Sequence, residues 1–185
     1  MIQTLGSEEF LVATTGKCSR EIYEIRERLG MSHANDFLTV GSMGHASSLA
    51  LGISLFSEKN IYCIDGDGAL LMHMGGLATA VQYGKENLKY ILMNNGCHES
   101  VGKQPTIAYR LDLKKILEGF GFKKVLTVNT VKELTEGIRE MQAQGKTALI
   151  ININEKSGKD LGRPASTPKE NKIMFQEKLR RPVRK

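Results

Sequence analysis

The sequence contains no tryptophan, only 6% aromatic residues and three cysteines in 185 residues. Cys18, Cys63 and Cys97 are widely spaced and form no CxxC pair, which is typical of a reducing compartment rather than of a disulfide-stabilised fold. No apolar run approaches the roughly 20 residues that a membrane-crossing helix needs. The first nine residues lack the charged start and apolar stretch of a signal peptide. We therefore expect a cytoplasmic protein with no membrane partner.

The charge is unevenly distributed. The net charge is +6, but residues 156–185 contain ten of the 26 Lys and Arg residues and only three of the 20 Asp and Glu residues. A nucleic-acid interface often adds aromatics that stack on bases, and this tail has only Phe175. We expect no nucleic-acid partner; steep salt dependence of binding would identify one. We expect the basic residues of the tail to form a solvated surface or a subunit contact. They are Lys178, Arg180, Arg181, Arg184 and Lys185.

Short apolar segments alternate with helical stretches along most of the chain. The expected strands are residues 10–14, 61–64, 89–93, 124–128 and 148–153, and the expected helices are 18–29, 45–57, 69–84, 110–119 and 131–144. This βαβα order is typical of a parallel sheet with helices on both faces, so we predict an α/β fold. Residues 1–155 are expected to form one domain, followed by a basic C-terminal extension over residues 156–185.

Two helix starts carry a capping-box sequence. Thr130 with Glu133 marks the helix at 131–144, and Gly145 is expected to end it. Thr167 with Glu170 repeats the pattern, and a proline between them suits the first helical position. The tail is therefore predicted to contain a short helix.

The most informative segment is residues 61–95. A strand is followed by Asp65-Gly-Asp-Gly68, a helix, a second strand and the pair Asn94-Asn95. Parallel strands joined by a right-handed crossover end at the same edge of the sheet, so Asp67 and Asn95 are predicted to be neighbours. The turn glycines allow the backbone to approach a ligand closely, and the N–H groups of a helix that starts near Ala69 favour binding of an anion.

The Asp67 carboxylate would repel a bare phosphate at this position. Mg²⁺ removes the conflict, because it binds a carboxylate, the Asn95 amide oxygen, a backbone carbonyl and phosphate oxygens in one octahedral shell. The pattern therefore predicts a metal-bridged diphosphate site. A Rossmann fingerprint would need a third glycine, and an EF-hand is excluded because the following residues are apolar. An ordinary glycine turn is the other alternative, which the Asn pair one βαβ unit later disfavours.

A second glycine-rich turn, Val40-Gly-Ser-Met-Gly44, leads into a helix of small residues. A methionine on such a turn usually fills the core. The flexible thioether of Met43 could instead support the middle of a bent, two-ring cofactor.

With these motifs, the chain resembles the diphosphate-binding half of thiamine-diphosphate-dependent decarboxylases. Within them it is most similar to the phosphonopyruvate decarboxylases, with the sulfopyruvate decarboxylases next. The similar segments are residues 13–21, 37–46, 65–74, 94–106 and 161–164. One departure is Asn94-Asn-Gly-Cys97, where many relatives carry Asn-Asn-Asp-Gly; either sequence offers a carbonyl ligand.

The resemblance implies roles for individual residues. The Mg²⁺ ligands would be Asp67, the Asn95 side chain and the backbone carbonyl of Cys97. The thiamine diphosphate contacts would come from Thr15, Gly16, Gly41, Met43, Gly66, Gly68, Ala69 and Asn95. Gly68 and Ala69 would donate backbone N–H groups to the diphosphate, Gly41 would meet the aminopyrimidine, and Met43 would support the bend between the rings.

The resemblance also implies a reaction in which the cofactor ylid attacks a keto carbon, carbon dioxide leaves and the thiazolium ring takes up the electrons. Phosphonopyruvate, which would give phosphonoacetaldehyde, is strongly anionic, so cationic or hydrogen-bonding residues should face it. The candidates are Lys17, Arg20, His98, Glu99, Ser100, Lys103 and Gln104, with His98 and Glu99 as the predicted catalytic pair. Solvated charge at a helix start is the alternative for Lys17 and Arg20. His45 and His73 are expected to be structural.

The implied active site is incomplete. In these enzymes a glutamate from a pyrimidine-binding domain activates the cofactor across a subunit interface, and this sequence shows no second α/β domain. We expect a separate subunit or a fragment that works in a dimer or higher oligomer with such a partner and releases no carbon dioxide alone. Other 2-keto acid decarboxylase or synthase subunits, and a non-catalytic assembly module with this fold, are the alternatives.

Overall fold

The computed structural model describes residues 1–154, 158 and 161–180. The expected domain boundary after residue 155 and the tail residues Arg181, Arg184 and Lys185 lie outside the described residues. Among the residues described, no helix combines the length and the apolar character that a membrane crossing requires.

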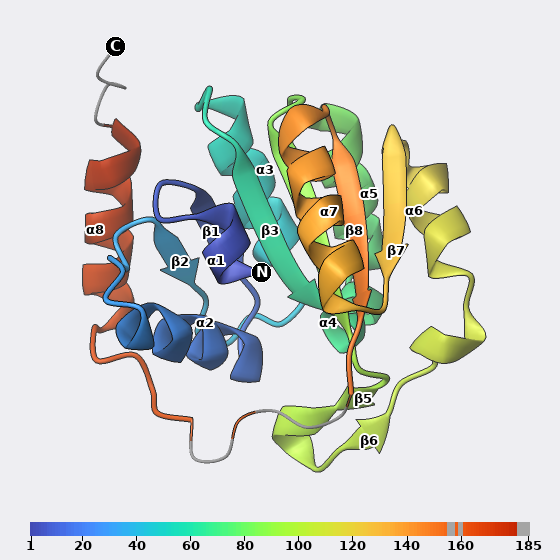
Figure 1. The fold of residues 1–185 in the computed structure, drawn as a ribbon, viewed down its shortest axis with the longest axis horizontal. Coiled ribbons are helices and arrows are strands. Elements are labelled where there is room, and N and C mark those ends of the chain that lie inside the picture. Colours follow the sequence, from blue (N-terminus) through green and yellow to red (C-terminus); the bar gives the residue numbers. More distant parts are fainter. Residues whose placement is uncertain (155–157, 159–160, 181–185) are drawn as a thin grey trace.

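A six-stranded sheet forms the centre of the molecule (Figure 1). Its order is β2-β1-β3-β4-β8-β7, and all neighbouring strands pair in parallel. The strands are β1 (Phe10–Ala13), β2 (Asp36–Leu38), β3 (Ile61–Gly66), β4 (Leu88–Asn94), β7 (Lys124–Val128) and β8 (Thr147–Asn152). The predicted α/β fold is confirmed. Strand order reverses between β1 and β3, and in open α/β sheets ligands bind outside the carboxyl ends of the strands at such a point.

Helices cover both faces of the sheet, because alternate side chains of the buried strands point to opposite sides. Phe10 and Val12 face one core, with α3 (Ala46–Leu55), α5 (Met74–Tyr83), α6 (Leu113–Phe120) and α8 (Pro168–Arg180). Leu11 and Ala13 face the other, with α1 (Ile2–Leu5), α2 (Lys17–Arg28) and α7 (Val131–Ala143). In Figure 1, α1 and α7 lie in front of the sheet and α3 and α5 behind it.

Several elements differ from the sequence prediction. The helix expected over residues 69–84 is two helices, α4 (Asp67–Met72) and α5, which meet at His73, so the first helix begins at Asp67 rather than near Ala69. The α7 helix has the predicted capping box at Thr130, but it ends at Ala143 with Gln144 in extended conformation, two residues before the glycine expected to stop it. Strand β2 was not predicted, because it has three residues and begins with an aspartate.

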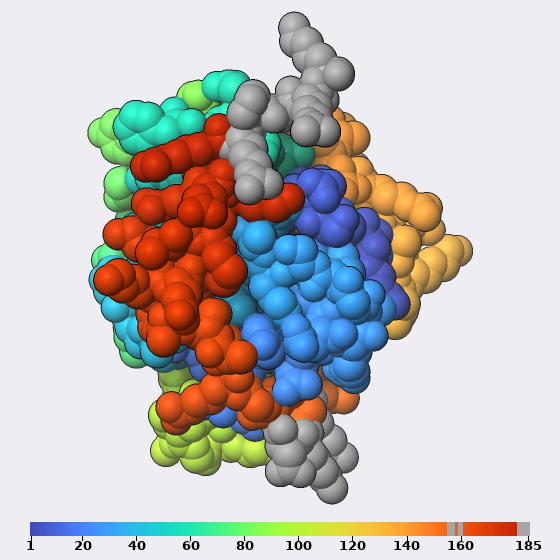
Figure 2. Space-filling view, turned by 90° about the vertical axis from the view of Figure 1, so that its left-hand side faces the viewer, coloured from blue at the N-terminus to red at the C-terminus, as the bar shows by residue number. Residues whose placement is uncertain are grey.

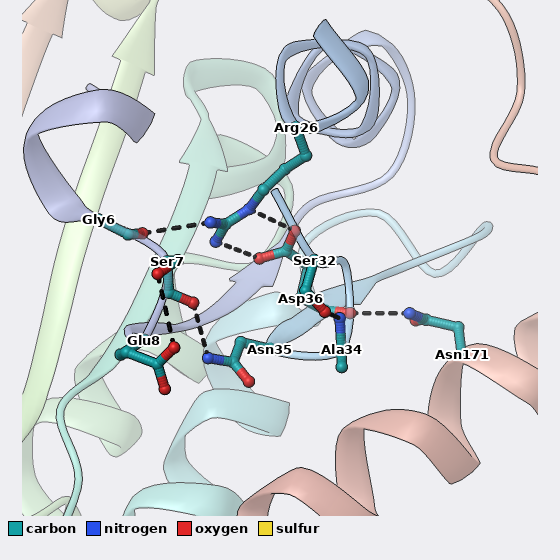
Figure 3. A network of polar contacts seen from close by, with 9 residues as sticks. All are labelled: Gly6, Ser7, Glu8, Arg26, Ser32, Ala34, Asn35, Asp36 and Asn171. Atoms are coloured by element: carbon teal, nitrogen blue, oxygen red, sulfur yellow. Dashed lines mark hydrogen bonds and ion pairs between the residues drawn. The ribbon is translucent and has the colours of Figure 1, made fainter. Parts of the chain in front are cut away.

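The aspartate that begins β2 is part of a buried polar network (Figure 3). Arg26 donates from Nε and Nη2 to the two carboxylate oxygens of Asp36 at 2.9 and 2.7 Å, and both side chains are 0% exposed. A third donor, Nη1 of Arg26, reaches the carbonyl of Gly6 at 3.2 Å. The amide of Asn171 donates to the Asp36 carbonyl at 2.7 Å. The network therefore joins α2, β2, the segment after α1 and α8.

The helix expected in the tail is α8, and it packs on the β2 edge of the sheet. Thr167 and Glu170 form the predicted reciprocal hydrogen bonds at its start. The ring of Phe175 is 2% exposed and makes edge contacts with Phe10 and Phe37, with ring centroids 5.5 and 5.6 Å apart. Figure 2 shows the described tail, in orange and red, lying against the blue surface of the α2 region.

Candidate functional site

The two motifs of the segment 61–95 meet where strands β3 and β4 end. The parallel register pairs Gly66 with Met93, so the turn that begins α4 and the Asn94-Asn95 turn leave the sheet side by side. Asp67 is the first residue of α4, and Asn95 directly follows β4. Both line a cavity of about 240 Å³ at the β1–β3 switch point. The predicted proximity of these two residues is confirmed.

Most of the predicted site residues line the same cavity. They are Thr15, Lys17, Met43, Gly66, Asp67, Gly68, Ala69, Asn95, Cys97, His98, Glu99 and Ser100. Gly16 and Arg20 line a second cavity, which shares Thr15 with the first. Gly41 lines neither, but its N–H donates to Thr15 Oγ1 at 2.9 Å. Lys103 and Gln104 are exposed on the hairpin of β5 (Cys97–His98) and β6 (Gln104–Pro105) and are not among the lining residues of either cavity.

The Asp67 carboxylate is held by a residue that sequence reasoning did not single out. Asp67 is 2% exposed, and its Oδ2 accepts a short hydrogen bond from Thr106 Oγ1. Thr106 follows β6, and its own N–H donates to the Gly96 carbonyl at 2.8 Å. The separation of 39 positions follows no motif spacing, so only the folded hairpin reveals the pair. Thr106 therefore orients the Asp67 carboxylate through Oδ2 and leaves Oδ1 to face another ligand.

Asn95 shapes the turn and keeps an acceptor position. Its Oδ1 accepts from the Cys97 N–H at 3.1 Å, and an amide oxygen has a second lone pair for another partner. Gly96 between them has φ +71°, and the ring of Tyr109 occupies the space that a Cβ would need. This position thus requires glycine for both its backbone conformation and its packing.

Gly68 forms the floor of a narrow cradle. A Cβ at Gly68 would lie 2.5 Å from ring atoms of His98 and 3.1 Å from the terminal methyl of Met43. Backbone, imidazole and thioether therefore converge above the first turn of α4. Among the described residues, no three His, Cys, Asp or Glu side chains are grouped to hold a metal. A metal bound at Asp67 would need amide, carbonyl and phosphate oxygens, which suits a hard cation such as Mg²⁺.

The Met43 turn is fixed to the junction of α4 and α5. Gly44 has φ +84°, and a Cβ there would lie 3.0 Å from the Ala69 carbonyl. Its own carbonyl is 3.1 Å from Nδ1 of His73, and the rings of His45 and His73 stack with centroids 4.7 Å apart. Through these contacts His45 and His73 join the Met43 turn to the junction of α4 and α5, which is a structural role of the kind expected.

A second acid lies beneath the cavity. Asp65 is 2% exposed, and its carboxylate accepts from the Gly66 N–H at 3.0 Å and the Tyr90 hydroxyl at 3.2 Å. Burial raises the pKa of Asp65 to about 6, against the hydrogen bonds from Thr14, Gly66 and Tyr90, which lower it. Burial, with the charge of Asp65 as a smaller cause, raises the pKa of the Cys18 thiol to about 12. Asp65 thus stabilises the turn at Gly66 through its hydrogen bond with the Gly66 N–H.

Lys17 and Glu99 close one side of the cavity. The Lys17 ammonium lies 3.0 Å from Glu99 Oε1, joining the first residue of α2 to the 3₁₀ turn η1 (Glu99–Val101). The Glu99 side chain is 11% exposed and that of Lys17 is 36% exposed. The pair brings the predicted catalytic Glu99 and a predicted cationic residue together, so the positive charge of Lys17 is partly balanced within the site.

Comparison with known proteins identifies the class to which this site belongs. Residues 14–152 match the C-terminal TPP-binding domain of thiamine pyrophosphate enzymes, and the chain belongs to this family. It is 33% identical to phosphonopyruvate decarboxylase of Streptomyces viridochromogenes over 171 residues, 92% of this chain and 42% of that protein. It is 31% identical to sulfopyruvate decarboxylase subunit beta of Methanocaldococcus jannaschii over 160 residues, 84% of this chain and 82% of that subunit.

Two further comparisons agree with this assignment. Sulfopyruvate decarboxylase subunit beta of Methanothermobacter thermautotrophicus is 38% identical over 118 residues, 64% of this chain and 61% of that subunit. A solved structure described as a thiamin diphosphate-dependent enzyme from Mycobacterium smegmatis has the same fold, with a TM-score of 0.60 and 22% identity over 80% of this chain and 29% of that one. The chain spans about two fifths of the phosphonopyruvate decarboxylases that it matches.

Thr106→Val tests the support of the Asp67 carboxylate. The substitution keeps the side-chain volume and removes the hydroxyl, so we expect Mg²⁺-dependent binding of thiamine diphosphate to weaken about 10-fold, as for other groups that orient a metal ligand. Calorimetric titration measures the change. Thr79→Val on α5, an exposed threonine whose hydroxyl donates to the Gly75 carbonyl at 3.0 Å, is the matched control. Equal affinity of the two variants would contradict this role of Thr106.

Proposed function

We propose that this chain is the diphosphate- and Mg²⁺-binding half of a thiamine-diphosphate-dependent 2-keto acid decarboxylase. The substrate we favour is phosphonopyruvate, converted to phosphonoacetaldehyde and carbon dioxide, with sulfopyruvate as the alternative. The observation that carries the proposal is the buried carboxylate of Asp67 beside Asn95 at the joint end of β3 and β4, above a glycine cradle. The similarity to phosphonopyruvate and sulfopyruvate decarboxylases supports it.

The residues that would hold the cofactor divide by its chemical groups. One oxygen of Asp67, the Asn95 amide oxygen and the Cys97 carbonyl would bind Mg²⁺. The N–H groups of Gly68 and Ala69 would bind the diphosphate, and the chain from Thr15 to Gly16 would line the same end. The Gly41 backbone would meet the aminopyrimidine and Met43 would support the ring system. When bound, the thiazolium ring supplies the acceptor for the electrons that decarboxylation releases.

His98 and Glu99 are the residues proposed for proton transfer and substrate contact. The ring of His98 lies over Gly68, at the wall of the cavity, where a general acid or base would face a bound substrate. Glu99 is held in place by Lys17 at 3.0 Å. Met43 and His98 together narrow the space above Gly68, which would restrict water near the reacting carbon.

A partner must complete the site in this proposal. Among its relatives is a protein named as the beta subunit of sulfopyruvate decarboxylase, 82% of which this chain covers, and such a subunit works with another chain. Large apolar side chains are exposed at the ends of the helices on one face, with exposed fractions of 90% at Phe56 after α3, 60% at Met72 of α4 and 74% at Tyr83 of α5. A partner that covers them would bury this apolar surface. We propose that a pyrimidine-binding domain supplies the activating glutamate in a dimer or higher oligomer.

Carbon dioxide release from the assembled enzyme tests this function. The chain is assayed with thiamine diphosphate and Mg²⁺, with and without a pyrimidine-binding partner, on phosphonopyruvate, sulfopyruvate and pyruvate. We expect release only in the complex and fastest turnover of phosphonopyruvate. Full activity of the chain alone would refute the proposal that a partner must complete the active site. Faster turnover of sulfopyruvate than of phosphonopyruvate would make sulfopyruvate the assigned substrate.

A further inference from the structure

A second cavity, of about 330 Å³, adjoins the cofactor cavity. Its walls come from the start of α2, the end of β2 and the tail segment that leads into α8. Thr15 lines both cavities. Figure 1 shows this tail segment passing below α2 at the edge where the strands end, and Figure 2 shows the same two segments in contact at the surface.

Two cationic side chains line this second cavity. Arg20 from α2 and Arg163 from the tail both line it, and none of the Asp and Glu residues that the structure describes does. No hydrogen bond or ion pair joins either guanidinium to another residue in the described part of the chain. The nearby acids of α2 bind the tail backbone rather than a guanidinium: Glu21 accepts from the Gly158 N–H at 3.0 Å and Glu24 accepts from the Gly162 N–H at 3.1 Å.

The remaining walls combine the apolar side chains of Leu38, Val40, Pro164 and Pro168 with polar side chains that are held by hydrogen bonds. Ser19 and Thr39 are buried and donate to the carbonyls of Thr14 and Ala13 at 2.6 and 2.8 Å. Asn171 is buried and bonds with the Leu38 N–H and the Asp36 carbonyl. The α2 helix begins after Gly16 with no side-chain cap, so its positive end adds to the charge of the two arginines.

We propose that the second cavity binds a tetrahedral oxyanion and holds the phosphonate or sulfonate end of the substrate, an inference that rests on the proposed function. The forked donors of a guanidinium match two oxygens of such a group, and two arginines match a dianion. The shared wall at Thr15 places this site beside the cavity for the cofactor, so a short 2-keto acid can contact both. A 2-keto acid that lacks the phosphonate or sulfonate group would leave both guanidinium groups without a bound anion.

Small anions test the site without turnover. Methylphosphonate, methanesulfonate and acetate are titrated into the chain in the presence of saturating Mg²⁺ and thiamine diphosphate, and amide NMR shifts are followed. We expect saturable shifts at residues 15–20, 38–40 and 163–171, largest for methylphosphonate. Arg20→Gln and Arg163→Gln should each weaken binding about 10-fold, because each removes one charge-assisted, forked contact. Arg139→Gln, an exposed change on α7, should leave binding unchanged.

The possible outcomes separate this inference from the proposed function. Shifts at residues 66–69 and 95–98, or equal binding by Arg20→Gln and Arg139→Gln, would overturn the oxyanion site. Binding of Mg²⁺ and thiamine diphosphate without any anion binding would overturn the site and leave the proposed function intact. Anion binding at the arginines in a chain that binds no thiamine diphosphate would refute the proposed function. A tighter fit for methanesulfonate than for methylphosphonate would assign the cavity to a sulfonate.

Discussion

Replacing Asp67 with asparagine is expected to weaken Mg²⁺-dependent binding of thiamine diphosphate by about 100-fold or more, because loss of a direct metal ligand exceeds the 10- to 100-fold cost of losing its support. Asp67 is the single acid among the proposed ligands, and asparagine preserves its size. Calorimetric titration of thiamine diphosphate, with and without Mg²⁺, measures the loss. The Mg²⁺-independent part of the binding should be unchanged.

The same substitution should leave the fold intact, which makes the result interpretable. Asp67 is buried, and Thr106 is its hydrogen-bond partner among the described side chains, so removing the charge does not strand an opposite charge. Asp112→Asn, at the exposed start of α6, is the matched control and should bind the cofactor normally. Undiminished Mg²⁺-dependent binding by Asp67→Asn would refute the metal site.

The parts of the site that sequence predicted are those that a short-range rule defines. A strand, a Gly-Asp-Gly turn, a helix and a second strand determine that Asp67 and Asn95 lie together, because parallel strands leave little choice of geometry. The division of the helix at His73 followed no such rule. It depends on the close packing of Gly44 against α4 and α5, which is a tertiary contact.

The parts that sequence missed depend on contacts between distant segments. Thr106 reaches Asp67 only because the β5–β6 hairpin folds back over α4. Arg163 and Arg20 line one cavity only because the tail crosses the edge where the strands end. Strand β2 is too short for a periodic pattern, and its buried Asp36 is compatible with the core only through Arg26. Hydrophobic periodicity and motif spacing along the sequence predict none of these three residue pairs.

Arg26→Met is expected to lower the free energy of unfolding by about 3–5 kcal/mol, because it leaves the carboxylate of Asp36 buried without its partner. Both side chains of the pair are 0% exposed, so water cannot replace the lost donors without local opening. Urea denaturation measures the loss. Arg28→Met is the matched control: this arginine is exposed on the same helix, and we expect a change within about 0.5 kcal/mol.

The double substitution Arg26→Met with Asp36→Leu separates the cost of a stranded charge from the value of the pair. Apolar residues of similar volume often replace a buried ion pair without loss, so we expect the double variant to recover most of the stability. Equal loss in the single and double variants would contradict this account and assign the stability to the hydrogen bond from Arg26 to the Gly6 carbonyl, which both variants lack. Because Asn171 of α8 bonds with the backbone of both Asp36 and Leu38 in β2, a shift of Asp36 in the single variant should also weaken methylphosphonate binding in the second cavity. The double variant should restore that binding together with stability.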